Sequence, residues 1–299
     1  MLIETKVGQL FVDVRGEGDS SGATDVIVLW PSLLTDGGMW RFQVPTLAER
    51  WRVVTIDPPG HGRSGLVRRP FTLEECADAV VTILDALGIE RAHFAGLSWG
   101  GMVGMRLALR HPARLRSLAL VDTNADRESR RKVPSYRAMM MIARLFGAGV
   151  PRLLDRIEPL YFTARTRRER RDLVDDFREH VASRDPVSLG HCLDAVIFDR
   201  VDIRDRIASI RMPTLVLVGA EDVATPIPRS RDIASRIDGA KLVVIAGAAH
   251  LSALEAPGAV TDELVRFFAS APTSTSVGMR MDAMRSRMST RSKITASRQ

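Results

Sequence analysis

The sequence predicts an α/β fold: a mostly parallel, doubly wound sheet with helices on both faces and a helical cap inserted after the sixth strand. Short apolar runs typical of buried strands alternate with helical patterns at both ends of the chain. Between residues 124 and 210 only helical patterns remain. We therefore expect a core formed by residues 1–123 and 211–270, a cap formed by 124–210, and a disordered basic tail at 271–299.

The first part of the predicted core contains a hairpin, two buried strands and two helices. Two alternating segments flank Val7-Gly8-Gln9 and predict the hairpin, and two continuous apolar runs predict strands buried on both faces. Apolar residues at a spacing of three and four predict the second helix. The expected elements are the strands Leu2–Lys6, Leu10–Arg15 and Val26–Trp30, the helix Met39–Arg50, the strand Arg52–Ile56 and the helix Leu73–Leu87.

The centre of the chain contains Gly96-Leu97-Ser98-Trp99-Gly100, a G-x-S-x-G pentapeptide. The apolar run Ala92–Ala95 precedes it and predicts a buried strand, and Met102–Arg110 follows it with the apolar spacing of a helix. A serine between a strand and a helix lies on a sharp turn that lifts its hydroxyl above the sheet, and glycines two residues away permit that turn. This context favours Ser98 as a nucleophile over a solvated serine in a glycine-rich turn. The next predicted strand is Leu115–Val121.

The predicted cap consists of helical segments with dense charge. Five arginines between residues 165 and 171 are read as a solvated helix face, with attraction of an anion at a pocket mouth as the alternative. Met139, Met140, Leu145 and Phe146 are candidates for the apolar lining of a substrate pocket, although packing between cap and core explains them equally well. The expected helices are Ser135–Leu145, Arg152–Tyr161, Arg168–Val181 and Pro186–Phe198.

The alternation of strands and helices resumes after the predicted cap. The remaining core elements are the strand Thr214–Val218, the helix Arg229–Ile237, the strand Lys241–Ile245 and the helix Pro257–Phe268. Because the carboxyl ends of parallel strands share one edge of a sheet, we expect the loops after these strands to meet the turn that contains Ser98.

Two further polar side chains follow strand ends and fit a nucleophilic mechanism with Ser98. A serine hydroxyl attacks well only when a base removes its proton, and His250 is the candidate base because imidazole titrates near neutrality. Asp222 would fix the tautomer of His250 and stabilise the imidazolium. Asp122, at the end of its strand, is the alternative acid.

With serine, aspartate and histidine in this chain order, the sequence resembles enzymes of the α/β-hydrolase fold over roughly residues 1–269. A narrower resemblance is to 3-oxoadipate enol-lactonases, which have a similar segment after the third strand, a similar G-L-S-x-G-G turn and an H-L-x-x-x-E-x-P segment. The matching residues are Ser32-Leu33, Thr35-Asp36, Met39-Trp40, Gly96-Leu97-Ser98, His250-Leu251 and Glu255-Ala256-Pro257.

The same resemblance implies an oxyanion hole made of two backbone amides. One amide belongs to Trp99, directly after the nucleophile, and the alignment with the lactonases assigns the other to Leu33. Two departures accompany the match. Pro31-Ser32 stands where most of the family has His-Gly, and Leu34 stands where the lactonases have glycine.

The resemblance implies a serine hydrolase that cleaves a carboxylic ester or lactone through an acyl-enzyme on Ser98, with no metal or other cofactor. Cofactor-free carbon–carbon bond hydrolases and perhydrolases use the same three residue types and are alternatives. A non-hydrolytic ligand-binding protein on the same fold is an alternative of a different class. Haloalkane dehalogenases and epoxide hydrolases have an aspartate at the turn, so Ser98 counts against both.

Composition restricts the partners and the compartment. The net charge of +7 lies mostly at the C-terminal end, where residues 270–299 contain six basic residues and one acidic residue, a net +5. The body of the chain is therefore close to neutral, which argues against nucleic-acid binding.

Two cysteines provide neither a disulfide framework nor a metal site. The N-terminus lacks a signal-peptide pattern and no apolar run reaches the ~18 residues of a membrane span, so we expect a cytoplasmic protein of undetermined oligomeric state that acts on a small molecule.

Overall fold

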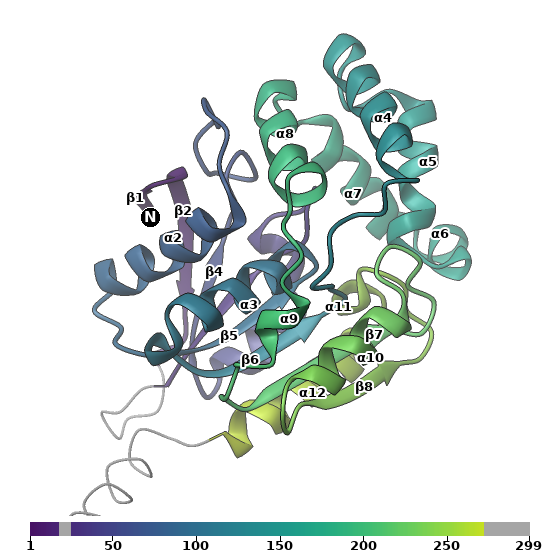
Figure 1. The fold of residues 1–299 in the computed structure, drawn as a ribbon. Coiled ribbons are helices and arrows are strands. Elements are labelled where there is room, and N and C mark those ends of the chain that lie inside the picture. Colours follow the sequence, from purple (N-terminus) through teal and green to yellow (C-terminus); the bar gives the residue numbers. More distant parts are fainter. Residues whose placement is uncertain (18–24, 272–299) are drawn as a thin grey trace, which may run out of the picture.

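The computed structural model describes residues 1–17 and 25–271, in which an eight-stranded sheet forms the centre of the molecule (Figure 1). The predicted tail at 272–299 lies outside the described residues. The strand order is β1-β2-β4-β3-β5-β6-β7-β8. The strands are β1 (Leu2–Thr5), β2 (Gly8–Arg15), β3 (Val26–Trp30), β4 (Arg52–Ile56), β5 (Ala92–Leu97), β6 (Leu115–Val121), β7 (Thr214–Gly219) and β8 (Lys241–Ile245).

Strands β3 to β8 are parallel, and β1 and β2 are antiparallel at one edge. Strands β3, β5 and β7 are buried along their whole length. Strands covered on both faces need apolar side chains on both faces, which explains why they read as continuous apolar runs. The mostly parallel α/β sheet predicted from the sequence is confirmed.

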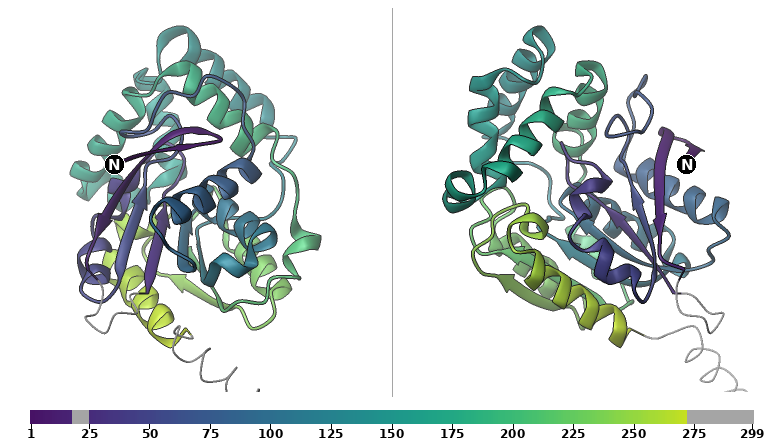
Figure 2. Two further views of the ribbon diagram at one scale, coloured as in Figure 1. Left: turned by 90° about the vertical axis from the view of Figure 1, so that its left-hand side faces the viewer. Right: turned by 180° about the vertical axis from the view of Figure 1, so that it is seen from behind.

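Helices cover both faces of the sheet (Figures 1 and 2). On one face α2 packs on α3, and α9 contacts both α3 and α10. On the other face α1 contacts α12, which also packs on α11. The bounds are α1 (Val44–Ala48), α2 (Leu73–Ala86), α3 (Trp99–Arg110), α9 (Arg204–Ile207), α10 (Ile227–Arg236), α11 (Ser252–Glu255) and α12 (Pro257–Ser270), with short 3₁₀ helices η1 (Gly37–Trp40) and η2 (Pro112–Arg114).

The segment between β6 and β7 forms a group of helices beyond the carboxyl ends of the strands (Figure 1). We refer to α4–α8 together with η3 as the cap. Helix α9 falls inside the range predicted for the cap, but it packs against core helices. The cap elements are α4 (Val133–Phe146), α5 (Pro151–Tyr161), α6 (Ala164–Glu169), α7 (Arg171–Ala182), α8 (Pro186–Leu193) and η3 (Asp194–Phe198).

Three helices expected to be continuous are divided in the structure. The predicted helix 39–50 becomes η1 and α1, and Pro45 lies in the first turn of α1, where its missing amide donor breaks no hydrogen bond within the helix. The predicted helix 168–181 is interrupted at Arg170, whose φ of −124° and ψ of 60° end α6 before α7 begins. The predicted helix 186–198 changes from α-helical to π-helical at Asp194.

Candidate active site

Ser98 lies on a strained turn between β5 and α3, with φ 54° and ψ −106°. Two glycines permit this turn: a Cβ on Gly96 would lie 2.1 Å from the carbonyl carbon of Gly100, and a Cβ on Gly100 would lie 2.2 Å from the carbonyl oxygen of Trp30. The Ser98 amide donates to the carbonyl of Val121 at 2.8 Å. A non-glycine residue at positive φ costs free energy, so the packing around this turn maintains a conformation that the isolated chain disfavours.

The structure brings Ser98, His250 and Asp222 together at the carboxyl ends of the strands. The Ser98 hydroxyl lies 2.8 Å from Nε2 of His250, and Nδ1 of His250 lies 2.9 Å from Oδ2 of Asp222. A carboxylate can only accept, so Nδ1 of His250 carries the proton and Nε2 is left to accept from the serine. All three side chains are buried.

Asp222 is held in place by its own loop after β7. Its Oδ1 accepts from the amides of Ala224 and Thr225, each at 2.8 Å, and its Oδ2 accepts from the Thr225 hydroxyl at 2.6 Å. Burial works against the charge of Asp222, but the His250 ring and these donors outweigh it and lower the pKa of Asp222. Burial likewise opposes protonation of His250, but the Asp222 charge and hydrogen bond outweigh it and raise the pKa of His250 above 6.5.

Asp122, the alternative acid, is fully buried and its carboxyl group has other partners than His250. Oδ1 accepts from the amide of Gly219 at 2.7 Å, and Oδ2 accepts from the hydroxyl of Ser252 at 2.5 Å. Burial and the nearby charge of Asp222 raise the pKa of Asp122 to about 8. Of the two acids that the sequence left open, the structure places Asp222 in hydrogen bond to His250.

The loop after β3, which contains Leu33, is joined to the turn of Ser98 by a backbone hydrogen bond. The amide of Gly100 donates to the carbonyl of Pro31 at 3.2 Å, which joins this loop to the turn. Trp99 is the first residue of α3, so its amide has no acceptor within the helix and is free for a ligand. The oxyanion hole formed by the Leu33 and Trp99 amides stays a prediction.

His61 bonds the loop after β3, a role that fits a structural histidine. Its Nδ1 donates to the carbonyl of Pro59 at 2.8 Å, and its Nε2 accepts from the amide of Leu34 at 3.2 Å. Burial and the nearby Arg184 charge lower the pKa of His61 to about 3, so the ring remains neutral and Nε2 remains an acceptor. Leu34 has φ 69°, which explains why a glycine would be the ordinary residue at this position.

Tyr161, at the end of α5, is a residue of the site that the sequence analysis missed. Its hydroxyl donates to the carbonyl of Leu33 at 3.3 Å, and its ring packs edge-on against His250 with 5.3 Å between centroids. Its own carbonyl accepts from the amide of Leu251 at 3.1 Å. A tyrosine at the end of an amphipathic helix has no motif that would reveal these contacts.

An apolar cavity of about 80 Å³ lies between the cap and the loop after β3. Met139 and Met140 line it, as do Leu33 and Tyr161. Leu145 and Phe146 do not line it, and 66% and 73% of their surfaces are exposed. Leu145 and Phe146 therefore lie outside this cavity, and their role in substrate binding stays a prediction.

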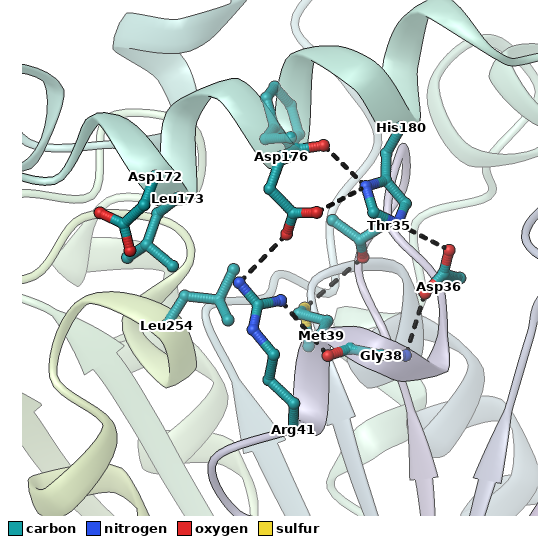
Figure 3. Close-up of a pocket in the computed structure, with 11 residues that line it drawn as sticks. Thr35, Asp36, Gly38, Met39, Arg41, Asp172, Leu173, Asp176, His180 and Leu254 are labelled. Carbon is teal, nitrogen blue, oxygen red and sulfur yellow. Dashed lines mark hydrogen bonds and ion pairs between the residues drawn. The ribbon is translucent and has the colours of Figure 1, made fainter.

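A larger, polar cleft of about 500 Å³ separates η1 from helix α7 of the cap (Figure 3). Arg41 pairs with Asp176 at 3.1 Å, and Nε2 of His180 pairs with Asp36 at 3.2 Å. Ser98 is among the lining residues of neither space, but the smaller apolar cavity is lined by Leu33 and by Tyr161, whose ring packs against His250, so it is the better candidate for the space near the nucleophile.

Within residues 1–17 and 25–271, no group of three or more histidine, cysteine, aspartate or glutamate side chains is arranged to hold a metal ion. The two cysteines, Cys76 and Cys192, are buried and unbridged. In the same part of the chain no helix has both the length and the apolar character needed to span a membrane.

Comparison with known proteins adds an independent line of evidence. The family model described as alpha/beta hydrolase fold matches residues 25–257. The chain is 32% identical to 3-oxoadipate enol-lactonase 1 of Acinetobacter baylyi, over 77% of this chain and 84% of that protein. It is 30% identical to the putative carbamate hydrolase RutD of Azorhizobium caulinodans, over 82% and 92%.

A solved structure is also similar over most of the chain. The enol-lactonase from Burkholderia xenovorans LB400 superposes with a TM-score of 0.83 and 31% identity, over 90% of this chain and all of that one. The resemblance to α/β hydrolases and to enol-lactonases that the sequence predicted is confirmed by these matches.

Proposed function

Because the chain belongs to the alpha/beta hydrolase fold family, and is a hydrolase, we propose that it cleaves carboxylic esters or lactones through an acyl-enzyme on Ser98. His250 is the proposed base and Asp222 the proposed orienting acid. The observation that supports this most directly is the series of two hydrogen bonds, 2.8 Å from Ser98 to His250 and 2.9 Å from His250 to Asp222.

The proposed reaction begins when the Ser98 oxygen attacks the carbonyl carbon of the substrate. Nε2 of His250 takes the serine proton, and Asp222 stabilises the imidazolium through the Nδ1 hydrogen bond. The carbonyl oxygen becomes an oxyanion, which the amides of Leu33 and Trp99 stabilise.

Collapse of this intermediate breaks the bond to the alcohol oxygen, which takes the proton from His250. For a lactone the alcohol stays covalently attached to the acyl group. Water then attacks the acyl-enzyme with His250 again as base, and the acid is released while Ser98 regains its proton.

The relatives support the choice of bond. A lactonase and a carbamate hydrolase each act at a carbonyl carbon bonded to a heteroatom. The same attack on such a carbon is the step that the arrangement of Ser98 and His250 is suited to perform.

Turnover of a short p-nitrophenyl ester tests the proposal. Ser98→Ala should reduce kcat on the order of 10⁶-fold with the fold intact, because one hydroxyl contributes little to stability and the nucleophile is lost. A fluorophosphonate should add covalently to the native protein and not to Ser98→Ala. Ser32→Ala, which removes a buried hydroxyl from the loop after β3, should still be labelled. Labelling of Ser98→Ala, or substantial turnover by it, would reject the nucleophile and with it the proposed function.

A further inference from the structure

We infer that the apolar cavity beneath α4 is the acyl subsite of Ser98, and that it takes a short, uncharged aliphatic acyl group and excludes one that ends in a carboxylate. This inference rests on the proposed function and specifies its substrate class.

Two residues of the cavity wall connect it to the site of Ser98 and His250. Leu33, whose amide is a proposed oxyanion donor, forms part of its wall. Tyr161 forms another part, and its ring lies against His250 while its hydroxyl bonds the Leu33 carbonyl. An acyl chain extending from the Ser98 oxygen past the oxyanion donors would therefore enter this space.

The wall of the cavity is almost entirely hydrocarbon. Its lining contains no charged side chain, and its only polar side-chain groups are the hydroxyls of Tyr136 and Tyr161. The remaining lining is apolar and comes from α4, α5, α7, α8 and η3 of the cap, the connection between α4 and α5, and the loop after β3.

The cations near the cavity are engaged elsewhere or face solvent. Arg200 and Arg229, whose charges act on the Tyr136 hydroxyl of the wall, each pair with Glu128 at 3.8 Å. Arg184 is buried and pairs with Asp36 at 3.7 Å. Arg144 is an exposed residue of α4 whose guanidinium lies against Gly190, outside the lining. A carboxylate placed in the cavity would lose its hydration without gaining a cation, which is strongly unfavourable.

The uncharged cavity does not match the substrate that the name of the lactonase relatives gives. The enol-lactone of 3-oxoadipate keeps one free carboxylate of the parent dicarboxylate. An acyl subsite without a cation does not suit that group, so similarity over the fold does not extend to this substrate. A cavity of about 80 Å³ suits a short alkyl chain instead.

Two esters of equal acyl length test the inference. p-Nitrophenyl hexanoate and mono-p-nitrophenyl adipate both have a six-carbon acyl group and the same leaving group, and only the adipate ends in a carboxylate. We expect kcat/KM for the hexanoate to exceed that for the adipate by about 100-fold or more. From acetate upward, each added methylene should raise kcat/KM about three- to four-fold until the cavity is full.

A matched pair of variants locates the selectivity. Met140 lines the cavity, whereas Met141 on the same helix has 53% of its surface exposed. Met140→Arg should reduce the preference for hexanoate over adipate at least about ten-fold, and Met141→Arg should leave it nearly unchanged. If Met140→Arg does not fold, Met140→Ala should lower kcat/KM for hexanoate about five-fold relative to acetate, with Met141→Ala as the control.

The outcomes separate this inference from the proposed function. Equal or faster cleavage of the adipate by a native enzyme that Ser98→Ala inactivates would overturn the neutral acyl subsite and leave the serine mechanism standing. Equal effects of the substitutions at 140 and 141 would place the acyl group outside the cavity. Failure of the native enzyme to cleave any of these esters would reject both the acyl subsite and the proposed function.

Discussion

Replacing His180 by glutamine should abolish part of the pH dependence of stability between about pH 6.5 and pH 9. His180 lies on helix α7 of the cap and bonds Asp36 of the core loop at 3.2 Å (Figure 3). Asp176 also faces the ring at 3.3 Å and pairs with Arg41, while Arg184 faces Asp36 at 3.7 Å. This group of charges joins the cap to the loop that contains the proposed oxyanion donor.

The direction of the pH effect follows from the two pKa values. The hydrogen bond that His180 donates to Asp36 outweighs burial and raises the pKa of His180 from 6.5 to about 9. Its contribution to stability is therefore complete below pH 6.5 and is lost as the pH rises through 9. Burial opposes the charge of Asp36, but the His180 bond and charge outweigh it and lower the pKa of Asp36 to about 2. That contribution is complete above pH 3.8 and is lost as the pH falls towards 2.

The magnitude is limited by solvent. The full difference between pKa values of 6.5 and about 9 would correspond to about 3.4 kcal/mol. Because 37% of the His180 side chain is exposed, screening by water reduces the expected contribution to about 1 kcal/mol. For a domain of this size such a loss lowers Tm by about 2 °C.

Thermal unfolding of the native protein and His180→Gln at pH 6 and pH 9 measures this contribution. The native protein should lose about 2 °C more than the variant between the two pH values. His191→Gln is the matched control, because His191 is also in the cap and its Nδ1 has no hydrogen-bond partner among the described residues. The reasoning is refuted if His180→Gln keeps the full native pH dependence, or if His191→Gln loses as much.

Two further predictions concern the chemistry. Asp222→Asn should lower kcat by about 10⁴-fold, because the amide favours the wrong tautomer of His250; Asp122→Asn should lower it far less, since its carboxyl group bonds Gly219 and Ser252. The opposite ranking in folded proteins would make Asp122 the orienting acid. Because the net effect of its surroundings raises the pKa of His250, kcat/KM should increase with pH through an apparent pKa above 6.5. A profile that is flat from pH 5 to 9 would show that His250 is not the base.

The core was predictable because its strands satisfy one simple condition. A strand of a covered parallel sheet has apolar residues on both faces, so Val26–Trp30 and Leu115–Val121 could be read from the sequence with the bounds that the structure shows. The turn at Ser98 was equally readable, because its two flanking glycines meet a steric requirement that a Cβ would violate.

The cap was less predictable because its helices are apolar on more than one face. Helix α4 has methionines that line the cavity and large apolar residues, Leu145 and Phe146, that are exposed. Composition alone does not distinguish these two faces. Tyr161 reaches His250 only through the packing of α5 on the core, which depends on contacts between segments far apart in the sequence.

Asp122 shows why two acids at one edge of a sheet have different partners. Both follow neighbouring parallel strands, so the sequence places both near His250. Asp122 bonds the amide of Gly219, which begins the loop of Asp222, and the hydroxyl of Ser252, two residues after His250. The donors around Asp122 therefore belong to the two loops that bring Asp222 and His250 together. Its buried carboxyl group joins these loops, while Asp222 accepts from Nδ1 of His250, so the surrounding donors give the two acids different partners.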